Sequence, residues 1–129
     1  MKTGNGKKTI LVVSQYFWPE DFRVNELVIG FQENGYNVEV LTGRPNYPSG
    51  TTFKEFKVNP NEFSIYRDIK VHRVWQFPRG KSTFGLLANF ISFVFMSCLY
   101  SLFRLRKKKY DVIFGVQLSP IISVIPAIL

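Results

Sequence analysis

Residues 9–23 read TILVVSQYFWPEDFR, and this stretch decides the fold of the chain. The apolar run at residues 9–13 predicts a parallel strand that is covered on both faces. Beyond it the chain turns at a proline, and Glu20 and Arg23 accompany the start of a helix that we expect to begin near Asp21. In an open α/β sheet, ligands bind beyond the carboxyl ends of such strands. The stretch therefore predicts an α/β fold with a binding site at its strand ends.

The same design returns at residues 41–48, which read LTGRPNYP: an apolar strand end, then a rigid loop with a basic residue. Between the two stretches, apolar residues follow helical spacing as far as Asn34, and Gly35 supplies a C-terminal stop. A strand, helix and strand joined by short connections form a right-handed unit with parallel strands. We therefore expect the two loops to converge on one site.

Polar and aromatic residues that follow these strands are the candidates for substrate binding. Glu and Arg near a helix N-terminus suit contacts with hydroxyls or phosphate of a ligand, and they also suit a purely local salt bridge. Aromatic rings either stack on a ligand or pack locally. The proline-stiffened loop is either a preformed wall for a substrate or a structural turn. The candidates are Tyr16, Glu20, Arg23, Arg44, Asn46, Tyr47, Gln117 and Ser119.

The net charge of +8 is unevenly spread, because a basic cluster directly follows a stretch without formal charge at residues 84–103. That stretch is long enough to cross a bilayer as a helix, and its polar residues lean weakly to one side. We expect a helix docked in the membrane interface and held by anionic lipid. A helix buried against a partner surface is the first alternative. A true span is the second, although a single crossing would split the sheet. The cluster comprises Arg104, Arg106, Lys107, Lys108 and Lys109.

The remaining segments complete a doubly wound parallel sheet. Residues 69–74 alternate and predict a third strand, and residues 110–116 predict a fourth. Residues 50–63 are polar and predict a surface loop with little regular structure. Residues 121–129 begin an apolar helix without a cap, and residues 1–8 predict a disordered tail. We therefore expect one incomplete domain at residues 9–129.

The composition limits the classes of binding and catalytic site that the chain can form. Cys98 is the single cysteine, which excludes an internal disulfide and suits a reducing compartment. The single histidine, His72, lies within a predicted strand, so we interpret it as a packing or surface residue, and no Cys/His cluster predicts zinc. We expect no metal and no cofactor, and the catalytic base is unknown. The lack of G-x-G-x-x-G after Val13 argues against a dinucleotide binder, and the lipid-like helix beside the basic cluster argues against nucleic acid.

Four stretches resemble the N-terminal portion of bacterial family-4 glycosyltransferases of the GT-B fold, of the kind that build capsule, O-antigen and exopolysaccharide. The resemblance covers nearly the whole chain in the order of the family. The stretches are ILVVSQYFWPEDFRVNEL, ENGYNVEVLTGRPNYPSG, IKVHRVWQFPRGKS and KKYDVIFGVQLSPI.

The resemblance implies the Rossmann-like, acceptor-side half of a GT-B enzyme, with the donor-binding domain missing. The full enzyme would transfer a sugar from a nucleotide-sugar donor to a polyprenyl-diphosphate-linked acceptor, without a metal. It would work as a peripheral protein on the cytoplasmic face of the plasma membrane. By itself the chain would be inactive, because stabilisation of the leaving diphosphate would come from the missing domain. The alternative is a non-catalytic membrane-binding or interaction module left by truncation.

Overall fold

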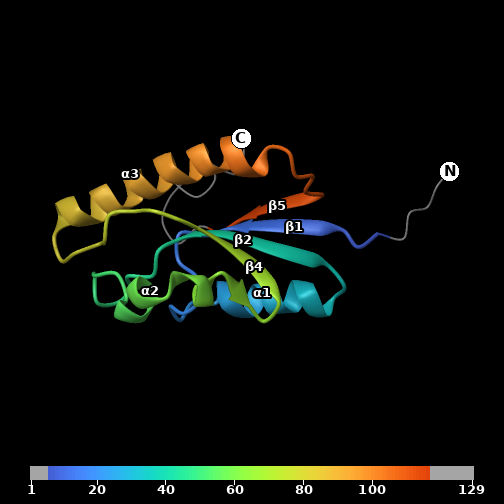
Figure 1. Cartoon of the computed structure of the whole chain (residues 1–129), viewed down its shortest axis with the longest axis horizontal. Helices are drawn as coiled ribbons and strands as arrows, with labels where there is room; N and C mark the ends of the chain where they lie inside the picture. Colours follow the sequence, from blue (N-terminus) through green and yellow to red (C-terminus); the bar gives the residue numbers. More distant parts are fainter. Residues whose placement is uncertain (1–5, 117–129) are drawn as a thin grey trace.

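A computed structural model describes residues 6–116 of the chain. These residues form a five-stranded sheet in the order β3-β4-β2-β1-β5, in which every neighbouring pair is parallel except β3 and β4 (Figure 1). The elements are β1 (Thr9–Val13), α1 (Val24–Glu33), β2 (Asn37–Gly43), α2 (Lys54–Val58), η1 (Pro60–Phe63), β3 (Ile65–Tyr66), β4 (Ile69–Val74), α3 (Thr83–Tyr100), η2 (Ser101–Leu105) and β5 (Val112–Gly115).

Helices cover both faces of the sheet, which confirms the expected α/β architecture (Figure 1). Alternation along β1 and β2 divides the core into two clusters, because successive side chains of a strand point to opposite faces. Val12 and Val40 are fully buried under α1, with Val28 of that helix. Leu41 packs on the other face, where Phe93 of α3 is fully buried. The sheet is therefore the middle of three layers.

Two parts of the sequence prediction are wrong. Residues 50–63 are not an irregular loop, because they contain α2 and the 3-10 helix η1. Their aromatic residues Phe56 and Phe63 are buried with ring centroids 5.7 Å apart, and this packing outweighs the polar composition of the segment. The sheet is also not wholly parallel, because the short strand β3 forms an antiparallel hairpin with β4.

The boundaries of other elements shift slightly. Helix α1 begins at Val24 rather than near Asp21, because the preceding residues form turns before the helix starts. The expected fourth strand at 110–116 is the shorter β5. Residues 1–5 of the predicted tail, the predicted helix at 121–129, and the candidates Gln117 and Ser119 lie outside the described residues.

Helix α3 differs from an ordinary surface helix, because several of its polar side chains are buried and many of its large apolar side chains are exposed. Its N-cap is Ser82, whose hydroxyl accepts from the backbone N–H of Gly85 at 3.0 Å, and it continues directly into the π-helical η2. Polar side chains of α3 and η2 face the sheet and are buried: Asn89, Ser92, Ser97 and Ser101. Large apolar side chains face outward and are exposed: Phe84, Leu87, Ile91, Phe95 and Leu102. We call this second set the apolar stripe.

Candidate functional site

The carboxylate of Glu20 fastens the first strand-end loop to the second. Its Oε2 accepts the backbone N–H of Tyr47 at 2.7 Å and that of Asn46 at 3.1 Å. Its Oε1 lies 3.5 Å from the backbone nitrogen of Phe17 in its own loop. The two loops meet, as expected from the sequence, and Glu20 is the group that holds them together.

Burial dominates the ionisation of Glu20. The side chain is 2% exposed, and desolvation raises the pKa of its carboxyl to about 7, although backbone N–H donors and Arg73 oppose the change. Both carboxylate oxygens are directed to backbone groups of the loops. Glu20 therefore holds the two loops in position through backbone groups.

Aromatic rings line the junction of the loops. Tyr16 stacks on Phe22 with centroids 5.2 Å apart and lies 5.9 Å from Tyr47. The Tyr16 hydroxyl donates to Oδ1 of Asn89 on α3 at 3.1 Å, and Gln15 donates to the same oxygen at 2.7 Å. The first loop is thus tied to α3 as well as to the second loop.

A cavity of about 460 Å³ opens beside this junction, at the N-terminus of α3. Tyr47 forms one wall, and the loop between β4 and α3 brings the cations Arg79 and Lys81. The Arg79 guanidinium lies 5.5 Å from the centroid of the Tyr47 ring. Two cations and a helix N-terminus give the cavity a positive potential suited to an anion. The full lining is Tyr47, Pro48, Arg79, Gly80, Lys81, Ser82, Thr83 and Leu86.

The predicted binding residues do not all reach this cavity. Tyr47 lines it, whereas Tyr16 is buried behind it. Arg44 is directed elsewhere, with its guanidinium 5.9 Å from the centroid of Phe56. Asn46 is 1% exposed, and its amide donates to the Arg44 carbonyl at 3.0 Å. Arg23 is exposed at the start of α1, where its side chain has no hydrogen bond or ion pair within residues 6–116.

The loop between β4 and α3 supplies the two cations of the cavity, which are not among the predicted binding residues. Its basic residues, Arg79 and Lys81, were visible in the sequence as a charged run before an apolar helix. A second missed residue is Arg73, whose guanidinium donates to the carbonyls of Phe63, Gly43 and Trp18. Burial lowers the pKa of Arg73 to about 10, partly offset by Glu20. Arg73 braces the loops from the α1 side of the sheet.

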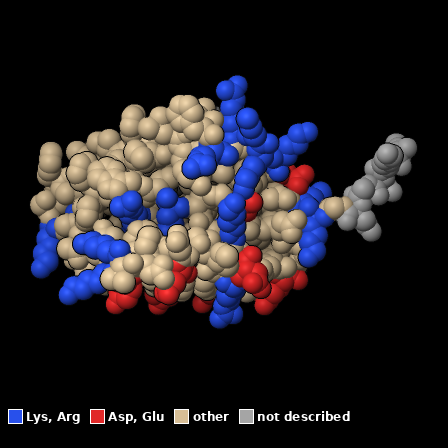
Figure 2. Space-filling model, viewed as in Figure 1, with Lys and Arg blue, Asp and Glu red and all other residues tan. Residues whose placement is uncertain are grey.

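The surface over α3 is almost without charge, and Lys and Arg gather at its C-terminal end (Figure 2). An apolar groove of about 450 Å³ runs along the apolar stripe, beside the aromatic pair Trp75 and Phe77. Residues Thr83–Leu105 form a helix of 23 residues whose most apolar window of 18 residues has a mean hydropathy of 1.9, so the helix is long and apolar enough to cross a bilayer by length and composition alone. Only 28% of its most apolar window is buried. An unusually large apolar surface therefore adjoins the basic cluster.

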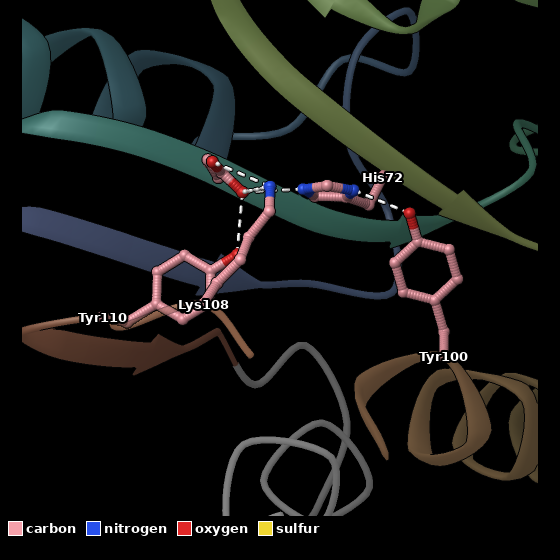
Figure 3. A network of polar contacts seen from close by, with 5 residues as sticks. His72, Tyr100, Lys108 and Tyr110 are labelled. Carbon is pink, nitrogen blue, oxygen red and sulfur yellow. Dashed lines mark hydrogen bonds and ion pairs between the residues drawn. The ribbon is translucent and has the colours of Figure 1, made fainter. Parts of the chain in front are cut away.

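His72 belongs to a network that joins the sheet to the end of α3 (Figure 3). Its Nε2 lies 2.7 Å from Glu39 Oε2, and its Nδ1 lies 2.8 Å from the Tyr100 hydroxyl. Because a carboxylate only accepts, Nε2–H donates to Glu39 and Nδ1 accepts from Tyr100 in the neutral ring. Glu39 also accepts from Tyr110 at 2.7 Å and from Lys108 at 3.2 Å.

This network keeps His72 neutral and Glu39 ionised. Burial lowers the pKa of His72 despite the neighbouring carboxylate. Burial alone would raise the pKa of Glu39, but hydrogen bonds from His72, Tyr110 and Lys108 outweigh it and lower that pKa. The interpretation of His72 as a packing residue agrees with this arrangement.

The described residues of the candidate site include no evident catalytic pair. Both nitrogens of His72 and both carboxylate oxygens of Glu20 are engaged. Within residues 6–116, no group of three His, Cys, Asp or Glu side chains is placed to hold a metal ion. The arrangement can bind an anionic group at the N-terminus of α3 and apolar chains along its outer face. Comparison with protein-family models, curated proteins and solved structures gives no match to this chain.

Proposed function

We propose that this chain is the acceptor-binding half of a glycosyltransferase, built on a Rossmann-like domain of the GT-B type. The full enzyme transfers a sugar from a nucleotide-sugar donor, bound by a second domain, to a polyprenyl-diphosphate-linked acceptor in surface polysaccharide synthesis. The chain works as a peripheral protein on the cytoplasmic face of the plasma membrane. The resemblance of its sequence to that family supports the reaction, and the site supports the class of acceptor.

One observation carries the proposal: the cationic cavity lies at the N-terminus of a helix whose outer face is apolar. Arg79 and Lys81 offer charge-assisted hydrogen bonds to a diphosphate. The apolar groove along the same helix offers a surface to the hydrocarbon chain attached to that diphosphate. Tyr47 stands at the cavity wall, where its ring can stack on the first sugar. A ligand with a sugar, an anionic linker and a lipid tail has groups for all three surfaces.

Membrane docking follows from the same helix. The apolar stripe presents large side chains such as Phe84, 80% exposed, and Phe95, 62% exposed, which are costly to leave in water. Asp and Glu gather on the side of the molecule away from α3, so the face that carries α3 meets an anionic membrane with less repulsion (Figure 2). The docked helix would lie along the bilayer surface, where its ligand resides.

Binding of a polyprenyl-diphosphate-linked monosaccharide in lipid nanodiscs tests the proposal. Replacing Arg79 and Lys81 by Ala should weaken binding by about tenfold or more, because charge-assisted hydrogen bonds contribute about 1.5–3 kcal/mol each. The control is Lys54→Ala with Lys57→Ala, which removes equal charge from the exposed face of α2. We expect the control to change binding by less than about twofold.

A matched polyprenol without diphosphate or sugar separates the two candidate roles. Equal binding of the two lipids by the wild-type chain would identify a general membrane-binding module and overturn the acceptor role. Sugar transfer by the full coding sequence, supplied with nucleotide sugars, then tests the reaction itself.

A further inference from the structure

A second concave site lies at the opposite end of α3, between η2 and β5. Its cavity has a volume of about 260 Å³. Arg106, Lys108 and Lys109 line it, and Leu11 and Ile113 provide apolar contacts. Arg104 and Lys107 belong to the same basic cluster, but they do not line the cavity. The cluster is therefore divided into residues that face a pocket and residues that do not.

Charge in this pocket remains positive after its neighbours are considered. Lys108 forms an ion pair with Glu39, which also accepts hydrogen bonds from His72 and Tyr110. The C-terminus of a long helix adds about half a negative charge. Arg106 and Lys109 have no ion pair within the described residues, and Asp111 is directed to the backbone N–H of Thr9. An anion therefore meets at least two uncommitted cations.

A residue that lines the pocket also carries an unpartnered buried hydroxyl. Ser101 lines the cavity and is 7% exposed, and its Oγ has no hydrogen-bond partner within residues 6–116. An unpaired buried hydroxyl costs free energy, which a ligand acceptor would recover. A phosphate oxygen is an acceptor that both this hydroxyl and the two cations can share.

The position of the pocket indicates where such a phosphate comes from. The apolar stripe ends at Leu102, and the exposed ring of Phe103 follows it. With the helix in the plane of the bilayer surface and the stripe in the acyl chains, the charged residues that follow the stripe lie at the level of the lipid phosphates. A free phosphate ion gains nothing from the adjoining apolar surface, whereas the acyl chains of a phospholipid can pack against it.

We propose that this pocket binds the headgroup phosphate of an anionic phospholipid, held by Arg106, Lys109 and the Ser101 hydroxyl. The inference rests on the membrane docking of the proposed function and adds a lipid site separate from the acceptor cavity. It predicts that binding of anionic lipid depends on which cations are present, and not only on how many.

Calorimetric titration with dihexanoyl phosphatidylglycerol below its micellar concentration tests the pocket without a membrane. The decisive variants carry equal charge changes: Arg106→Ala with Lys109→Ala in the pocket, and Arg104→Ala with Lys107→Ala outside it. We expect the pocket pair to weaken binding by about tenfold and the outer pair by less than about threefold. Ser101→Ala should weaken it by about threefold. Circular dichroism checks that each variant is folded.

Equal losses for the two charge-matched pairs would overturn the pocket and leave only a diffuse basic surface. Dihexanoyl phosphatidylcholine should not bind measurably, and comparable binding of that lipid would also overturn the proposal. Inorganic phosphate that binds as tightly as the lipid would show a free-phosphate site instead. None of these ligands contains a polyprenyl chain or a sugar, and Arg79 and Lys81 are intact throughout. A failed acceptor assay would therefore leave this result standing, and the reverse is equally true.

Discussion

Glu20 and Glu39 are two partly or fully buried glutamates with opposite surroundings. Glu20 lies beyond the end of β1 and accepts only from backbone N–H groups of the strand-end loops. Glu39 lies within β2 and accepts from three side chains, His72, Lys108 and Tyr110. Burial raises the pKa of Glu20 to about 7, whereas side-chain donors lower the pKa of Glu39. The nature of the donors and the depth of burial, rather than residue type, set the charge.

The difference assigns the two residues to different parts of the molecule. Glu20 shapes the loops beside the proposed acceptor cavity. Glu39 fastens the end of α3, and the segment before β5, to the sheet beside the proposed lipid pocket. Variants at the two positions should therefore separate the stability of the loops from that of the α3 end.

Glu20→Ala should produce the largest loss of stability. It leaves the buried N–H group of Asn46 and the partly buried N–H group of Tyr47 without their acceptor, which costs about 3 kcal/mol in the free energy of unfolding. Chemical denaturation at pH 6 measures the effect. Glu39→Ala should cost less, about 1–2 kcal/mol, because water can reach the partly exposed site. Glu26→Ala on the exposed face of α1 is the control and should change little.

If Glu39→Ala proved the more destabilising variant, the loops would not depend on the Glu20 carboxylate as the structure indicates. Loss of acceptor binding without loss of stability in Glu20→Ala would instead show direct contact with the ligand, the role predicted from the sequence.

The pH dependence of stability should separate the two glutamates by sign. The pKa of Glu20 is higher in the folded state than its ordinary 4.5, so the folded protein holds the proton more tightly. Its favourable contribution is complete below pH 4.5 and is lost as the pH rises through about 7. Relative to Glu20→Gln, the wild-type chain should lose about 3 kcal/mol in the free energy of unfolding over this range of pH.

Glu39 should show the reverse trend. The pKa values of Glu39 and His72 are both lowered in the folded state. Their favourable contributions to folding stability are therefore present at neutral pH and are lost on acidification. Relative to Glu39→Gln, the wild-type chain should therefore gain stability as the pH rises from acid to neutral. Chemical denaturation at several pH values measures how the stability difference between wild type and each variant changes with pH. The same trend for both variants would contradict the opposite pKa shifts of the two glutamates.

The elements that the sequence predicted well are those whose apolar pattern is strong. Residues 9–13 form β1 at the predicted boundaries, and residues 69–74 likewise form β4. The long apolar helix was placed to within a few residues, because an uncharged stretch between basic segments has few other conformations available. The α2 segment was missed, since two buried aromatic residues in a polar context carry little periodic signal.

The candidate site was harder to predict, because its contacts join distant parts of the chain. Nothing near Glu20 in the sequence shows that its acceptors face backbone N–H groups of a loop 26 and 27 residues away. The weak polar side of α3 was visible, but its direction was not. Asn89 fixes that direction by accepting from Gln15 and Tyr16 of the first loop. Long-range hydrogen bonds therefore decided what local pattern left open.

Tyr100→Phe gives the smallest and most specific test of the comparison. It removes the hydroxyl that donates to His72 Nδ1 and keeps the ring, so we expect a loss of about 1 kcal/mol in the free energy of unfolding. Without that donor, Nδ1 is freer to take up a proton while Nε2 still faces the Glu39 carboxylate, so the pKa of His72 should rise. NMR titration of the His72 ring measures it, with Tyr36→Phe on the exposed surface as control. A lowered or unchanged pKa would mean that Nδ1 carries the proton in the wild-type chain, and that Glu39 is not the group that orients the ring.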